Sequence, residues 1–193
     1  MLRRLYDWVM ALAGRRHAIW ALAGVSFAES AFFPIPPDVL LIPMVLADRR
    51  RAWRIAGVCT LASVLGGLLG YAIGLWLFDA VGQPLLEFYG SEEKFSQFQE
   101  YYNEWGGWIV GAGGFTPLPY KVITIASGVT RLDIGIFILA SVVARGLRYY
   151  IVAALLWRYG EPVRNFIERH LGKLALLFFV LLVGAFVLLT VLV

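Results

Sequence analysis

Long apolar stretches separated by short charged ones dominate the pattern of this chain. Residues 55–78 and 174–193 hold no formally charged side chain. About 20 apolar residues suffice for a helix to cross the hydrocarbon core of a bilayer. Residues 134–157 are long enough to do the same, although they contain Arg145 and Arg148. We therefore expect about three transmembrane helices.

Two further apolar stretches are interrupted by proline. Residues 17–47 contain Pro34, Pro36 and Pro37, and residues 106–130 contain Pro117 and Pro119. Proline removes a backbone donor and restricts the residue before it, so neither stretch can be one continuous helix. Each is predicted to be a helical hairpin with a break at its tip.

Arginines predict the direction in which each hairpin enters the membrane. They flank residues 17–47 on both sides, which places both ends in the cytoplasm by the positive-inside rule. This hairpin is therefore expected to be re-entrant from the cytoplasmic side. The basic segment 158–173 should be cytoplasmic by the same rule. Residues 134–157 cross the membrane to reach it, so the hairpin of residues 106–130 that precedes them should open from the outer side.

Amphipathic segments complete the expected layout. Residues 1–16 carry four arginines beside an apolar face and predict an interfacial helix. Residues 79–105 are acidic with aromatic residues at helical spacing, and predict an outer amphipathic helix that begins near Ser91. Residues 158–173 are expected to lie on the cytoplasmic interface.

The two proline segments match each other at a constant offset. Pro34, Pro36 and Asp38 correspond to Pro117, Pro119 and Lys121. Such an internal repeat, with hairpins of opposite sense, is typical of transporters in which broken helices meet near the membrane midplane. The predicted fold is an all-α, polytopic membrane protein of one domain, built as an inverted repeat. Small residues in the stretch 55–78 should allow close helix packing: Gly66, Gly67, Gly70 and Gly74.

Composition agrees with this class and excludes others. The chain is 60% hydrophobic and 16% charged, with a mean hydropathy of +0.74. Its net charge of +4 comes from basic residues beside apolar stretches, which indicates topology rather than nucleic-acid binding. The single cysteine, Cys59, excludes an internal disulfide. We find no catalytic motif and no metal-ligand spacing, so we expect neither an enzyme nor a cofactor.

Five ionisable residues lie within or beside the apolar segments: Glu29, Asp38, Lys121, Arg145 and Arg148. A charge at the bilayer centre costs roughly 2.5–3.5 kcal/mol on insertion scales, so each needs a reason. One interpretation is structural, with snorkelling arginines and a buried Asp38–Lys121 pair. The other is a polar cavity between the hairpin tips that accepts an anionic head group.

The cavity interpretation assigns a role to several of these side chains. Arg145 and Arg148 lie three residues apart, hence on one helix face, where their guanidinium groups could hold a phosphate. Glu29 and Asp38 are candidate carriers of a coupling proton, because a carboxyl group in an apolar environment is more easily protonated than one in water. The repeat predicts that Asp38 and Lys121 approach each other near mid-bilayer.

Four motifs together resemble the DedA family of bacterial inner-membrane proteins, within the VTT or SNARE-associated superfamily, and its YqaA-like branch. They are Glu29 with Pro34-Ile-Pro-Pro-Asp38, the glycine-rich residues 66–71, Gly114-Phe-Thr-Pro-Leu-Pro-Tyr-Lys121, and Arg145-Gly-Leu-Arg148-Tyr149. The resemblance implies translocation or scrambling of lipids such as undecaprenyl phosphate or phosphatidylethanolamine, with a dependence on the proton gradient. It also implies that Glu29 and Asp38 are the two membrane-embedded acids of the family.

The second hairpin departs from the pattern of many DedA members. They have arginines where this chain has Gly114 and Tyr120, and Lys121 follows one position later. Lysine and arginine are not interchangeable for bidentate phosphate binding, so this departure bears on the substrate more than on the mechanism. Arg145 and Arg148 are candidates to supply the missing guanidinium groups.

These observations predict a multi-pass protein of the bacterial inner membrane that moves a lipid head group between its hairpins. The expected partner is a phospholipid or undecaprenyl phosphate, and a homo-oligomer is compatible with the small residues of 55–78. Two alternatives stay open. One is a secondary transporter of a small anion, and the other is a non-transporting assembly or tethering factor, for which the charged hairpins would be dispensable.

Overall fold

The computed structural model describes residues 18–33, 36–84, 86, 92–115, 120–160 and 162, and all regular structure in these ranges is helical. The predicted interfacial helix 1–16, nearly all of 158–173 and the predicted transmembrane helix 174–193 lie outside the described residues. The elements are α2 (Ala18–Ala31), α3 (Asp38–Ala47), the short 3₁₀ turn η1 (Arg49–Arg51), α4 (Ala52–Leu77), the π-helical turn η2 (Phe78–Gly82), α6 (Glu92–Phe115), α7 (Tyr120–Val129) and a final helix, Ile134–Gly160.

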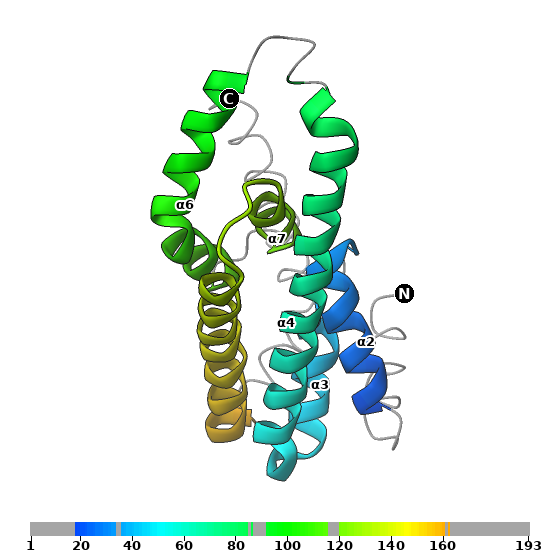
Figure 1. The fold of residues 1–193 in the computed structure, drawn as a ribbon. Coiled ribbons are helices and arrows are strands. Elements are labelled where there is room, and N and C mark those ends of the chain that lie inside the picture. Colours follow the sequence, from blue (N-terminus) through cyan, green and yellow to red (C-terminus); the bar gives the residue numbers. More distant parts are fainter. Residues whose placement is uncertain are drawn as a thin grey trace.

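Two long helices form the frame of the molecule. Figure 1 shows α4 beside the Ile134–Gly160 helix, with α2 and α3 against one side of α4 and with α7 between α4 and α6. Arg49–Gly82, which includes α4, and Ile134–Gly160 are long and apolar enough to cross a membrane. The remaining apolar helices α2, α3 and α7 are shorter than a bilayer needs.

The first proline segment separates α2 from α3. The backbone N–H groups of Phe32 and Phe33 both donate to the carbonyl of Ala28, which closes the end of α2. Pro37 then precedes the first turn of α3, where a missing N–H costs nothing. The break therefore falls where the prolines predict it.

The second proline segment lies outside the described residues, but the helices on both sides of it are clear. Helix α6 ends at Phe115 and α7 begins at Tyr120. The sequence pattern predicted a boundary between an outer segment, 79–105, and a hairpin, 106–130. Helix α6 instead runs across this boundary without a break. The reason is that Gly106 serves packing rather than chain reversal: a Cβ there would lie 2.3 Å from Leu132 Cδ1.

Glycines let both hairpins approach the backbone of α4. A Cβ on Gly66 would lie 2.0 Å from the carbonyl oxygen of Phe27 in α2, and one on Gly74 would lie 2.1 Å from that of Ile125 in α7. Gly70 lies between them, against Thr124. Gly67 is less confined, with its nearest neighbours at 3.4 Å. Helices α2 and α7 therefore pack at successive turns of one α4 face.

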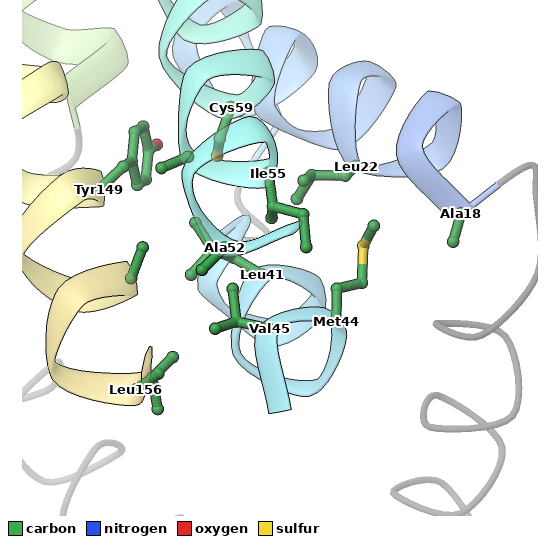
Figure 2. Close-up of a cluster of buried hydrophobic side chains, with 12 residues drawn as sticks. Ala18, Leu22, Leu41, Met44, Val45, Ala52, Ile55, Cys59, Tyr149 and Leu156 are labelled. Atoms are coloured by element: carbon green, nitrogen blue, oxygen red, sulfur yellow. The ribbon is translucent and has the colours of Figure 1, made fainter. Parts of the chain in front are cut away.

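An apolar cluster connects four helices at the end of the molecule where α2 begins. It contains Leu22 of α2, Leu41 and Val45 of α3, Ile55 of α4 and Leu156 of the last helix. Figure 2 shows these side chains between the four helices, with Tyr149 at the margin of the cluster. This cluster fixes the first hairpin against the two long helices.

The exterior of the described part carries large apolar side chains that a water-soluble protein would bury, and several polar groups are buried inside. Trp20, Trp76 and Trp108 are 75%, 71% and 76% exposed, whereas Ser30 and Ser63 are fully buried. Water would oppose such an exterior, but lipid tails solvate it, and polar groups then gather inside. The described fold is that of a helical membrane protein.

Candidate functional site: a buried network of ion pairs

Arg145 occupies the middle of a helix long enough to span a membrane. At 1.5 Å per residue it lies about 17 Å from the start and about 23 Å from the end of Ile134–Gly160. Its side chain is only 2% exposed. An arginine at this depth requires several partners, because an unpaired charge in an apolar interior is strongly destabilising.

The partners of Arg145 come from three helices. One terminal nitrogen, Nη2, donates to Glu29 Oε2 of α2 at 2.5 Å, and it also donates to the hydroxyl of Tyr149. The Nε group donates to Ser63 Oγ of α4 at 2.6 Å. Ser63 is in turn 2.7 Å from Ser30 Oγ, so the network reaches the C-terminal end of α2.

Two tyrosine rings enclose the guanidinium group. Its central carbon lies 4.7 Å from the ring centre of Tyr120 and 4.9 Å from that of Tyr149. These distances are within the range of cation–π attraction, which is stronger when the cation is desolvated. The hydroxyl of Tyr120 donates to Ser141 Oγ, which orients the ring. Tyr120, the first residue of α7, thus brings the second hairpin to Arg145.

A second ion pair lies on the same helix face. Arg148 Nη2 donates to Asp38 Oδ2 at 2.7 Å. The side chains of Arg148 and Asp38 are 21% and 22% exposed, so this pair is more accessible than Glu29–Arg145, whose side chains are 14% and 2% exposed. The two acids of the first hairpin therefore each pair with one arginine of Ile134–Gly160.

Lys121 does not form the predicted ion pair with Asp38. No ion pair between Asp38 and Lys121 occurs among the described residues, and Asp38 is bound to Arg148 instead. The expectation of a direct Asp38–Lys121 contact was wrong. One residue advances a helix by about 100°, so Lys121 lies on a different side of α7 from Tyr120, whose ring contacts Arg145.

The hairpin tips do approach each other through other residues. Thr124 Oγ1 of α7 lies 3.1 Å from the carbonyl oxygen of Ser30 in α2 and 2.9 Å from that of Lys121, with its hydroxyl proton available to either. These contacts occur beside Gly70, in the second half of α4. Helix α2 also contacts the Ala52 end of α4 through the apolar cluster, whereas Arg131, just after α7, binds Asp79 at the other end at 2.6 Å.

Several members of this network were not among the residues predicted from the sequence. Tyr149 lies four residues after Arg145, and Ser30 lies four residues after Ser26, so helical spacing could have indicated both. Ser141 lies four residues before Arg145 and could have been indicated in the same way. Ser63 carries no such signal, because single serines are common in apolar helices. Tyr120 was noticed only as a departure from the DedA pattern, whereas its ring contacts Arg145.

The arrangement is chemically suited to bind an anion. Two carboxylates neutralise two guanidinium groups, so an incoming anion can replace a carboxylate on an arginine without leaving either arginine unpaired. No group of three or more potential metal ligands occurs among the described residues.

Comparison with known proteins assigns the chain to a family. Residues 35–158 match the family model of the VTT domain. An uncharacterized protein of Haemophilus influenzae is 38% identical over 157 residues, covering 81% of each chain, and one of Histophilus somni is 38% identical over 168 residues, covering 85% of this chain and 87% of the relative.

A more distant relative is described as a membrane protein. The uncharacterized membrane protein YkoX of Bacillus subtilis is 28% identical over 126 residues, which cover 63% of this chain and 56% of the relative. No solved structure matches the chain. The YqaA-like branch stays a prediction. The matched domain, the apolar exterior and the two helices long enough to span a membrane make this chain a member of the VTT-domain (DedA) family of membrane proteins.

Proposed function

We propose that the protein moves a polar, phosphate-bearing lipid head group across the bacterial inner membrane, between two re-entrant hairpins. The observation that carries this proposal is the pair of ionic contacts Glu29–Arg145 and Asp38–Arg148, which join the first proline-broken segment to the Ile134–Gly160 helix. An ordinary structural core would be more economically built from apolar side chains. A transporter of polar groups needs a polar path, which apolar residues cannot provide.

The chemistry of lipid transfer fits this arrangement. The main barrier is the removal of water from the head group, since the tails can stay among lipid tails. A head-group phosphate accepts hydrogen bonds from guanidinium groups at two points. Arg148, at 21% exposure, is the more accessible of the two arginines, so we assign the first contact with the phosphate to it.

Scrambling by the purified protein tests the proposal. Full-length protein is reconstituted into vesicles that contain a fluorescent phospholipid, and the lipid in the outer leaflet is bleached chemically. Accelerated loss of the protected inner-leaflet signal supports lipid transfer. If the vesicles instead accumulate radiolabelled phosphate or another small anion while lipid stays in its leaflet, the protein is an anion transporter.

Proton coupling forms a separate part of the proposal. Glu29 and Asp38 are the candidate carriers, and Glu29→Gln or Asp38→Asn should abolish transfer while folded protein is still obtained. Asp79→Asn is the matched control, because Asp79 forms an exposed ion pair with Arg131 away from the hairpin tips. Equal transfer rates in wild type and both carboxyl variants would exclude the proton role.

Substitutions in the same two hairpins test the tethering alternative. A factor that only assembles or tethers other proteins would keep its function when Asp38 and Lys121 are both replaced by alanine. A lipid transporter would lose it, because Asp38 holds Arg148 in place.

A further inference from the structure

A second cationic region lies far from the hairpin tips, where the two spanning helices end side by side. A Cβ on Gly160, the last residue of the final helix, would lie 2.5 Å from Arg49 Nε. The end of Ile134–Gly160 therefore packs directly against η1, which precedes α4. Both helices should reach the membrane–water interface at this level.

Arginines and tryptophans cover this end. We call it the basic–aromatic surface, and it is formed by Arg50, Arg51, Trp53, Arg54, Trp157 and Arg158. All six side chains belong to exposed residues. Among the described residues, the only ion pair on this surface joins Arg51 to Asp48, at 3.0 Å. The surface therefore carries a large excess of positive charge.

The aromatic rings are arranged as one unit that bridges the two helices. The ring centre of Trp53 lies 6.0 Å from that of Tyr150 and 6.2 Å from that of Trp157. Trp53 and Trp157 remain 46% and 49% exposed. Tryptophan favours the interface because its ring is apolar while its N–H can reach water or a head group. This geometry fits the glycerol and upper acyl region of a lipid.

We propose that the basic–aromatic surface binds anionic phospholipids of the leaflet at this end, with their phosphates on the arginines and their glycerol regions on Trp53 and Trp157. A free phosphate would not use the exposed rings. An acidic face of a second copy is also a poor fit, since Glu93, Glu100 and Glu104 lie on α6, whose contacts with Thr130 place it at the opposite end of the spanning helices.

Native mass spectrometry of the full chain in detergent tests this site. The protein is mixed with equal amounts of phosphatidylglycerol and phosphatidylcholine, and the two lipid adducts are compared. Each basic residue near an anionic surface contributes roughly fivefold in affinity. The wild type should therefore retain phosphatidylglycerol at least about tenfold better, and Arg50→Gln/Arg51→Gln/Arg54→Gln should lose most of this preference.

Three further variants separate this site from other effects. Replacing the same three arginines by lysine keeps their charge, and with it the insertion signal, and should keep most of the preference. Arg131→Gln removes an exposed arginine at the other end and should change nothing. Arg148→Gln should also keep the preference, so that failure of the proposed lipid path and failure of this surface give different results.

If the triple glutamine variant does not insert, the single variants Arg54→Gln and Arg158→Gln should each lower the preference several-fold. An equal preference in wild type and triple variant would overturn the proposal, as would equal retention of both lipids by wild type. A wild-type dimer that dissociates in the triple variant, with unchanged lipid binding, would also overturn it and assign the surface to a protein contact.

Discussion

At the scale of residues, the two arginines of the site differ in burial and should differ in role. Arg145 is enclosed by Glu29, Ser63 and two tyrosine rings, whereas the side chain of Arg148 is 21% exposed. Removing one partner of a buried ion pair costs about 3–5 kcal/mol, because the other charge is left uncompensated.

We therefore expect Arg145→Gln to lower the free energy of unfolding by about 3–5 kcal/mol, and Arg148→Gln by about 1 kcal/mol. Thermal unfolding of the purified protein in detergent measures both. Glu29→Gln/Arg145→Gln should be more stable than Arg145→Gln alone, since no unpaired charge remains. Equal losses for the two single arginine variants would contradict this division.

Tyr149 gives a finer test of the same network. Tyr149→Phe keeps the ring over Arg145 but removes the hydroxyl that accepts from Nη2. A hydrogen bond to a charged group contributes about 1.5–3 kcal/mol, and we expect a loss of this size in the same unfolding measurement. Tyr150→Phe, on an exposed neighbour, is the control and should have little effect.

The sequence predicted four of the charged residues that form this network, because charges in apolar segments are conspicuous. It did not predict their pairing. The repeat suggested Asp38 with Lys121, whereas Asp38 pairs with Arg148. Pairing depends on helix rotation, and a shift of one residue moves a side chain by about 100°. Sequence spacing fixes rotation within a helix but not between helices.

At the scale of elements, the glycines of α4 determine how closely the hairpins approach it. Gly66 and Gly74 lie against backbone carbonyl oxygens, which cannot move without shifting α2 or α7. Gly24, within α2, has nothing within 4 Å of the position of a Cβ.

Gly66→Ala and Gly74→Ala should each destabilise the protein by at least about 1–3 kcal/mol, the usual cost of overpacking. Gly24→Ala should stabilise it by roughly 0.5–1 kcal/mol, since alanine is the better helix former. Melting temperatures of the three variants in detergent give the comparison. Improved stability of Gly66→Ala would show that α2 does not pack on α4 at this point.

The prolines and glycines gave the order of these elements, because they act within a few residues of their position. The breaks after α2 and α6 fall at the proline segments. The continuity of α6 through Gly106 could not be foreseen, since its cause is a contact with Leu132, which is distant in sequence. Local rules thus predict where helices break more reliably than where glycine is tolerated.

At the scale of the whole molecule, an apolar exterior surrounds an interior in which apolar clusters and buried polar groups lie side by side. Leu61 of α4 is 67% exposed and Leu41 of α3 is fully buried. If lipid tails surround the exterior, truncating Leu61 changes little, because lipid fills the space. Truncating Leu41 leaves a cavity.

Leu41→Ala should therefore lower stability by about 2–5 kcal/mol, and Leu61→Ala by about 0.5 kcal/mol or less. Unfolding in lipid bicelles or detergent measures both variants. A large loss for Leu61→Ala would mean that this face packs against protein, for example in a homo-oligomer.

Composition alone predicted the membrane class, because it sums over the chain and does not depend on contacts. The meeting of the hairpin tips depends on contacts between distant residues, such as Thr124 with the carbonyl of Ser30. The repeat predicted that the tips meet but named the wrong side chains.

The most direct measurement of the central claim is lipid scrambling by Arg148→Gln in vesicles, at protein amounts matched to wild type and at a temperature where both proteins are folded. A phosphate that loses its charge-assisted hydrogen bonds in transit should cross at least about tenfold more slowly. We predict that loss for Arg148→Gln and wild-type rates for Arg131→Gln. Wild-type scrambling by Arg148→Gln would contradict the account.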